Sequence, residues 1–164
     1  MPLSSPTTIT NMDSQVQNIT STLPQTPEAA SAWNAAQAWA PVATAFFSSA
    51  VIPSVTPAGV SAGESAFVSA CQSSTGTTNT LTEAALSAGF TAYAAAIVAP
   101  GNCAPPTPVV HAPPVSPLVL SLSTLPASTT SLASTTALHS QLLSWAITGT
   151  QTTPGAPPVV VPWS

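Results

Sequence analysis

Lysine and arginine are absent from this chain of 164 residues, and its only carboxylates are Asp13, Glu28, Glu64 and Glu83. Globular proteins ordinarily carry a charge on roughly a quarter of their residues. Without a side-chain cation the chain has no guanidinium to hold a phosphate, no amine for a Schiff base and no basic patch for nucleic acid. We therefore expect no nucleic-acid partner and no chemistry that depends on a cationic side chain.

Glycine and aromatic residues are also scarce, whereas alanine, serine, threonine and 19 prolines dominate the composition. Disordered chains combine low hydrophobicity with high net charge, but here 45% of the residues are apolar and the net charge is only −4. A nearly uncharged surface promotes association. The composition therefore favours a subunit of a larger assembly, whose contacts depend on shape and hydrogen bonds and respond little to salt.

Signals for export and membrane insertion are missing as well. Residues 1–20 are polar and lack the basic region and the apolar core of a signal peptide. The most apolar stretch, residues 84–99, is interrupted by polar side chains and is shorter than the ~20 residues of a membrane span. We expect no membrane partner.

The two cysteines, Cys71 and Cys103, leave two alternatives open. A disulfide between them would close a loop of roughly thirty residues and stabilise the fold by ~3–4 kcal/mol. Alternatively, both thiols are reduced and behave as small buried apolar groups. No histidine lies at metal-ligand spacing from either cysteine, so we expect no zinc site and no cofactor.

The distribution of proline predicts three parts. Residues 1–25 and residues 151–164 are expected to be proline-rich extended arms. Between them, residues 26–150 are expected to form a mainly α fold, a small helical domain of about four helices. A proline-rich connection over residues 100–117 interrupts this domain, because proline is excluded from regular helices and central strands.

Local signals place the helices within the central part. Thr26, Pro27 and Glu28 are typical of a helix start, and Pro41 is expected to break that helix. The expected helices cover residues 27–40, with a further segment that ends before Pro53, and then residues 61–72, 80–98 and 129–148.

The helix over residues 80–98 has the clearest pattern. Thr80 and Glu83 form a capping box, and an apolar stripe follows at Leu86, Phe90, Tyr93 and Ile97. Further along, Leu118, Leu120 and Leu122 alternate with Val119, Ser121 and Ser123, which allows one short strand.

No motif predicts catalysis. Gly63, Glu64 and Ser65 match the beginning of a hydrolase nucleophile elbow, but Phe67 stands where the elbow needs its second glycine. We expect this stretch to be a helix N-terminus with Glu64 near its positive end.

The remaining candidates for chemistry are isolated from one another. His111 and His139 have no carboxylate near them in sequence, and no two carboxylates lie three or four residues apart. Asn18 begins a glycosylation acceptor motif that we interpret as a chance match in a Ser/Thr-rich arm. We expect no enzyme activity and no small-molecule substrate.

The tryptophans are candidates for core or interface anchors. The C-terminal arm has few neighbours in sequence against which to bury its valines and its tryptophan. We therefore expect Trp163 to insert into a pocket on another chain, by strand addition or a related contact. The candidate interface anchors are Trp163, Val160, Trp145 and Trp33.

The chain resembles small tailed-bacteriophage virion proteins that are rich in alanine, threonine and proline. The resemblance lies in Phe90, Tyr93 and Ile97 on an alanine-rich helix, in the run from Pro113 to Leu118, and in Trp145 followed by a Thr-Gly-Thr sequence and an apolar tail. It implies a non-enzymatic structural subunit of a virion, bound to other virion proteins and to copies of itself. The lack of a basic lining for DNA favours the tail or baseplate over the capsid.

An exported cell-surface or cell-wall protein is the alternative from another class. The abundance of serine, threonine and proline in the chain is typical of O-glycosylated stalks, and a disulfide between Cys71 and Cys103 would suit an oxidising compartment.

Overall fold

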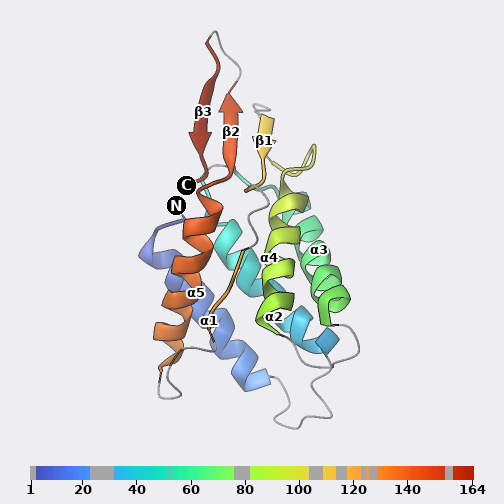
Figure 1. Cartoon of the computed structure of the whole chain (residues 1–164), viewed down its shortest axis with the longest axis vertical. Helices are drawn as coiled ribbons and strands as arrows, with labels where there is room; N and C mark the ends of the chain where they lie inside the picture. The colour runs from blue at the N-terminus through green and yellow to red at the C-terminus, as the bar shows by residue number, and fades with distance from the viewer. Residues whose placement is uncertain are drawn as a thin grey trace.

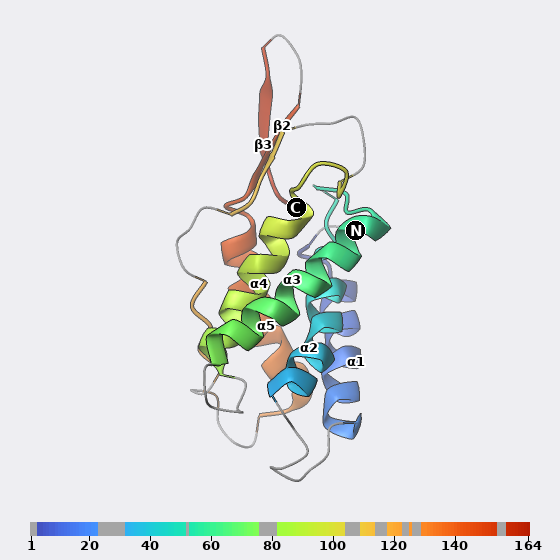
Figure 2. The same ribbon diagram turned by 90° about the vertical axis from the view of Figure 1, so that its right-hand side faces the viewer.

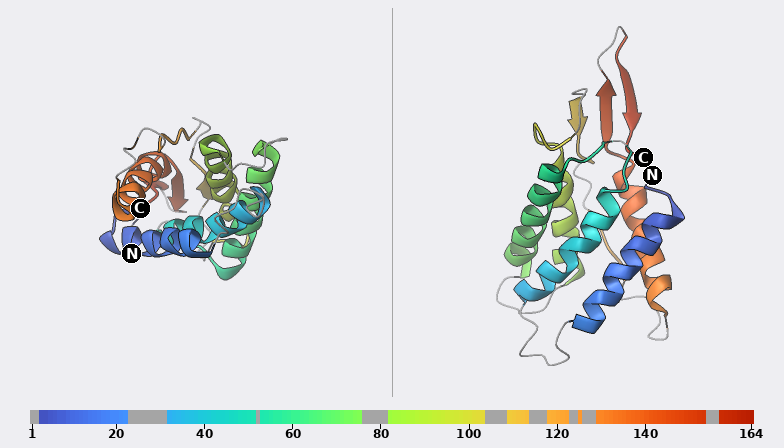
Figure 3. Two further views of the ribbon diagram at one scale, coloured as in Figure 1. Left: turned by 90° about the horizontal axis from the view of Figure 1, so that it is seen from below. Right: turned by 180° about the vertical axis from the view of Figure 1, so that it is seen from behind.

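The computed structural model describes residues 3–22, 32–51, 53–75, 82–103, 109–113, 118–122, 125, 129–153 and 157–164. This part of the chain is mainly helical, as predicted (Figure 1). The helices are α1 (Pro6–Thr22), α2 (Ala32–Phe47), α3 (Pro57–Thr75), α4 (Glu83–Ile97) and α5 (Ser131–Ala146), and the strands are β1 (Val109–His111), β2 (Thr150–Thr153) and β3 (Val159–Pro162). α1, α2 and α3 lie side by side, α4 packs on α3, and α5 packs on α1 (Figure 3).

α1 occupies most of the predicted N-terminal arm, so the expectation of an extended chain is wrong for residues 6–22. Pro6 suits the first helical position because its missing N–H would have no helical partner there. The buried side chains of α1 recur at helical spacing but include few apolar groups: Thr8, Met12, Asp13 and Ile19. Since two of these are polar, the buried face does not stand out in the sequence.

α2 continues through Pro41, where a break was predicted. A proline inside a helix has no N–H for the carbonyl four residues earlier, here that of Gln37, and costs ~3 kcal/mol. Buried packing on both sides of Pro41 holds the helix together, through Ala36, Ala40, Val42, Ala43, Phe46 and Phe47. The predicted start of this helix at Thr26 lies outside the described residues.

α3 and α4 make the most extensive helix contact, and two glycines allow their close approach. A Cβ on Gly89 would lie 2.6 Å from Cys71 Sγ, and a Cβ on Gly63 would lie 2.6 Å from the Tyr93 ring. The predicted apolar stripe of α4 is buried, which confirms the pattern at Leu86, Phe90, Tyr93 and Ile97.

The cap of α4 differs from the predicted capping box. Thr82, not Thr80, accepts the hydrogen bond from the N–H of Ala85, at 3.2 Å. The Glu83 carboxylate accepts from the backbone N–H of Leu122. α3 also extends beyond the predicted residues 61–72 at both ends.

Residues 118–122 run between α4 and α5 (Figure 1). Leu118 and Leu120 are buried while Val119 is 69% exposed, so the predicted alternation is confirmed. The predicted strand is wrong, because the backbone N–H groups find side-chain acceptors in place of a neighbouring strand. These acceptors are the Ser87 hydroxyl, the Gln141 amide and the Glu83 carboxylate.

The predicted C-terminal arm forms a hairpin instead of an extended segment. β1, β2 and β3 make an antiparallel sheet in that order, and β2 and β3 project beyond the ends of the helices (Figures 1 and 2). The hairpin returns the chain to the bundle, where Trp163 is buried. Its ring lies 6.4 Å from that of Phe47 and leaves no room for a side chain at Gly149.

Candidate functional site

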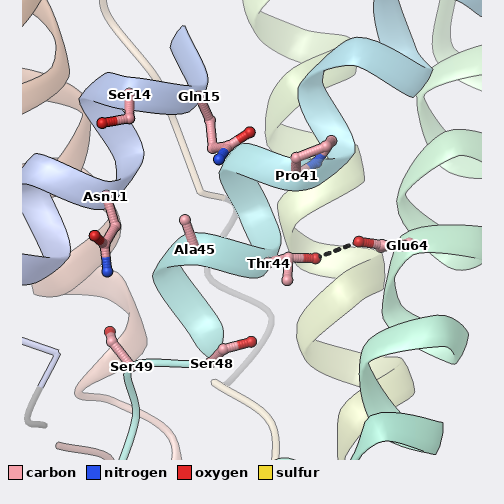
Figure 4. Close-up of a pocket in the computed structure, with 9 residues that line it drawn as sticks. All are labelled: Asn11, Ser14, Gln15, Pro41, Thr44, Ala45, Ser48, Ser49 and Glu64. Carbon is pink, nitrogen blue, oxygen red and sulfur yellow. Dashed lines mark hydrogen bonds between the residues drawn. The ribbon is translucent and has the colours of Figure 1, made fainter. Parts of the chain in front are cut away.

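The layer formed by α1, α2 and α3 carries two grooves that meet at one carboxylate. The first, of about 380 Å³, lies between α1 and α2 (Figure 4). The second, of about 480 Å³, lies between α2 and α3. Glu64 lines both grooves. The other lining residues are small or uncharged: Asn11, Ser14, Gln15, Pro41, Thr44, Ala45, Ser48 and Ser49 in the first groove, and Gln37, Ala40, Ser65, Val68, Ser69 and Gln72 in the second.

A hydrogen-bond relay connects Glu64 to the core. The Thr44 hydroxyl donates to Glu64 Oε1 at 2.7 Å, and it lies 3.1 Å from the Tyr93 hydroxyl. Since a hydroxyl has a single proton to donate, Thr44 accepts from Tyr93 when it donates to Glu64. Burial raises the pKa of Tyr93 to about 12, and the Glu64 charge acts in the same direction. Tyr93 therefore stays a donor across the neutral range.

Glu64 and Ser65 lie in the middle of α3, not at a helix N-terminus as predicted. Position 63 needs a glycine because the Tyr93 ring packs directly over it and leaves no room for a Cβ. Ser65 is exposed, and its hydroxyl donates to the Ser61 carbonyl of its own helix at 2.9 Å. This regular helical geometry lacks the strand-to-helix turn of a nucleophile elbow.

The other described carboxylates connect elements within the fold. Asp13 on α1 accepts hydrogen bonds from Ser131 and Thr135 on α5, at 2.7 and 3.1 Å, and from Gln17 at 2.7 Å. Glu83 binds the segment that runs between α4 and α5. Glu28 lies outside the described residues. Of the carboxylates that the structure describes, Glu64 alone reaches the grooves.

His139 is part of the core. Its Nε2 lies 2.7 Å from the carbonyl oxygen of Leu3, and its ring meets Phe46 edge to face at 5.8 Å. The side chain of His111 lies outside the described residues, although its backbone belongs to β1. No group of three or more potential metal-ligating side chains occurs within the described ranges.

The two cysteines are free thiols at different ends of α3. Cys103 forms a β-bridge with Val55, just before α3 begins at Pro57. Cys71 lies further along the helix, and a rise of 1.5 Å per residue separates the two cysteines by roughly 20 Å. A disulfide needs Cα atoms within ~7 Å, so the disulfide alternative is wrong. Burial raises the pKa of both thiols, to about 12 for Cys71.

The four predicted interface anchors separate into different groups. Trp163 and Trp145 are buried within their own chain, so the expectation that Trp163 enters a pocket on another chain is wrong. The Trp33 side chain lies outside the described residues. Val160 is 59% exposed on β3. Of the three anchors whose side chains the structure describes, Val160 alone is exposed.

Val160 is one of several exposed apolar side chains at the end of the molecule that carries the sheet. We name Val51, Ile147, Val159 and Val160 the apolar end; they are 50%, 47%, 55% and 59% exposed. Val51 and Ile147 lie at the base of the hairpin, since Val51 N–H binds the Ser164 carbonyl just after β3 and Ile147 follows α5 just before β2. Val159 and Val160 lie at the start of β3, away from that base, and as successive strand residues they face opposite sides of the sheet. The sequence contains no spacing that would have revealed these exposed apolar positions.

The outer edge of β3 is blocked by proline. The N–H of Trp163 donates to Gly149 at 3.0 Å, and the register pairs Gln151 with Val161. Because the backbone polar groups of successive strand residues point alternately toward and away from the neighbouring strand, those of Pro158, Val160 and Pro162 point away from β2. Since proline has no N–H, Val160 offers the one donor among these three positions, and strand addition at this edge is disfavoured.

No protein-family model, curated protein or solved structure matches the chain. None of the helices in the described ranges has the length and apolarity to cross a membrane.

Proposed function

We propose that the chain is a non-enzymatic structural subunit of a viral particle, a tail or baseplate component of a bacteriophage, held by apolar and hydrogen-bonded contacts with other virion proteins and with copies of itself. The apolar end carries this proposal, because it exposes valine and isoleucine side chains on the projecting hairpin and at its base. The virion setting rests on the sequence resemblance described above.

The size of the apolar end indicates what kind of contact it makes. Covering one half-exposed valine or isoleucine contributes on the order of 1 kcal/mol, so the four side chains contribute on the order of 4 kcal/mol. Association costs about 4–15 kcal/mol in lost freedom of motion. Apolar contact alone is therefore too weak, and the interface must extend onto the surrounding hydroxyl and amide groups.

The polar surface suits such an extension. Serine, threonine and glutamine side chains form hydrogen bonds without the long-range repulsion between like charges. The hairpin then docks by its two faces, since proline blocks the outer edge of β3. A tail or baseplate position fits a chain with no cation to face DNA.

Light scattering of the purified chain at increasing concentration tests the proposal. We expect a mass above the 16.3 kDa of the monomer, and we expect the association to persist from about 0.05 M to about 1 M NaCl because it does not depend on ion pairs. A folded monomer at every concentration contradicts this expectation.

A matched pair of variants locates the contact. Val159→Ser combined with Val160→Ser should weaken association by about thirtyfold, from the loss of about 2 kcal/mol, while the helical circular dichroism is unchanged. The control combines Val119→Ser with Leu132→Ser, at two exposed apolar positions outside the apolar end, and should associate like the parent chain. Equal loss in both pairs would show that surface hydrophobicity in general drives the association. Intact mass separates the exported alternative, which requires added hexoses.

A further inference from the structure

We propose that Glu64 is a docking site for a cationic side chain, lysine or arginine, of a partner polypeptide. This inference rests on the proposed function, because it assumes that the surface formed by α1, α2 and α3 meets another subunit. It assigns a second contact to that subunit, separate from the apolar end, and it names the chemistry of the group that binds there.

The position of Glu64 is the first reason. It projects from α3 toward α2, at the point where the two grooves meet (Figure 4). Oε1 accepts the hydrogen bond from Thr44, whereas Oε2 has no hydrogen-bond partner among the described residues. A carboxylate has acceptor sites on both oxygens. One oxygen is thus held by the fold, and the other is available to a ligand that donates hydrogen bonds.

The rigidity of this carboxylate is the second reason. Thr44 connects it to Tyr93, and the Tyr93 ring is fully buried and stacked on Phe47, with 4.8 Å between the ring centroids. Exposed glutamates ordinarily lose side-chain entropy when they bind. Here the relay holds the side chain in place beforehand, which lowers the cost of docking.

The charge of the lining is the third reason. The amides of Asn11, Gln15 and Gln37 and the serine hydroxyls that line the grooves can each donate or accept hydrogen bonds, and Glu64 is the one charged residue among the described residues of both linings. Lysine and arginine bring three and five donor N–H groups, a positive charge and no acceptor. They therefore complement the Glu64 carboxylate, whereas an anionic group is repelled by it.

The origin of the cation follows from composition. The whole chain contains no lysine and no arginine, so no side chain of either type, in this copy or in a second one, can fill the site. Both grooves are open along the surface, which suits a side chain presented by another protein. A charge-assisted hydrogen bond of this kind adds specificity and register to an interface that apolar contacts alone leave loosely defined.

Binding of an arginine peptide tests the site. The probe is a capped tetra-arginine peptide, and capped tetra-citrulline is its uncharged analogue. Amide chemical shifts of the ¹⁵N-labelled full chain report where each peptide binds. We expect tetra-arginine to shift signals from residues 40–48 and 60–68, and we expect tetra-citrulline to leave them nearly unchanged.

Two variants with the same net charge distinguish specific binding at Glu64 from general electrostatic attraction between the peptide and the chain. Glu64→Gln should weaken tetra-arginine binding at least about tenfold. Glu83→Gln removes the same charge elsewhere, and should change binding by less than about twofold. Thr44→Val keeps the carboxylate but removes the hydroxyl that orients it, and we expect an intermediate loss. Thermal unfolding of each variant checks that the fold is retained.

Several outcomes would overturn the inference: equal losses in Glu64→Gln and Glu83→Gln, equal binding of the two peptides, or shifts that fall outside the grooves. These outcomes are distinguishable from failure of the proposed function. If the apolar-end variants lose association while Glu64→Gln binds the peptide normally, the structural role stands and the cation site is rejected.

Discussion

Individual carboxylates in this protein act without cationic partners. A buried charge is costly unless hydrogen bonds replace its hydration, and the chain has no lysine or arginine to pair with it. Asp13 accordingly takes hydroxyl and amide donors, Glu64 takes a threonine, and Glu83 takes a backbone N–H. Each described acid thus holds two elements together where an ion pair would serve in a more ordinary composition.

Trp163 shows how one residue determines whether the C-terminal segment belongs to the core. Its ring is buried, and its indole Nε1 has no hydrogen-bond partner among the described residues. We predict that Trp163→Ala lowers the free energy of unfolding by about 3–5 kcal/mol through loss of buried volume. Trp163→Phe should cost clearly less, because it removes no hydrogen bond. Urea unfolding measures both, and equal losses would point to a role for the indole N–H.

At the scale of single elements, apolar periodicity could be predicted from sequence where the buried face is apolar. The stripe on α4 and the series Leu138, Leu142 and Trp145 on α5 identify their helices. α1 was not predicted as a helix because the polar residues Thr8 and Asp13 occupy half of its buried face, so the apolar periodicity is lost. The hairpin was not predicted because the prolines of this segment suggest an extended arm, whereas Pro158 and Pro162 face outward from an edge strand.

The candidate site could not be predicted for a different reason. Thr44, Glu64 and Tyr93 come from three different helices. In sequence, Thr44 is 20 residues from Glu64 and 49 residues from Tyr93. No local spacing connects such residues, since only the packing of α2 against α3 and α4 brings them together. Gly63 was the nearest signal, because a glycine inside a helix indicates a close neighbour.

Pro41 gives the test at this scale. It lies inside α2 and removes a helical hydrogen bond, so Pro41→Ala should raise the free energy of unfolding by about 1–3 kcal/mol. Pro57 is the matched control, because it begins α3, where proline costs nothing. Pro57→Ala should therefore leave stability unchanged or slightly lower. A loss of stability in Pro41→Ala would mean that the proline ring makes packing contacts that outweigh the missing bond.

For the whole molecule, the composition leaves very few groups that can titrate in alkaline solution. With no lysine or arginine, the side chains that titrate between about pH 8 and 12 are those of Cys71, Cys103 and Tyr93. All three lose water contact on folding, and burial raises the pKa of each. The alkaline stability of this protein is therefore controlled by three residues.

The sign of the pH effect follows from these shifts. In the unfolded chain the thiols have their ordinary pKa of 9.0 and the phenol its ordinary pKa of 10.0, whereas burial raises the pKa of Cys71 and of Tyr93 to about 12 in the folded protein. The unfolded state thus loses protons first, and stability falls as the pH rises from about 9 to about 12. Replacing both cysteines by alanine should delay the decline until about pH 10, and adding Tyr93→Phe should remove it up to about pH 12. Urea unfolding at successive pH values measures this, and a decline that still begins at pH 9 without the cysteines would show that another process destabilises the fold.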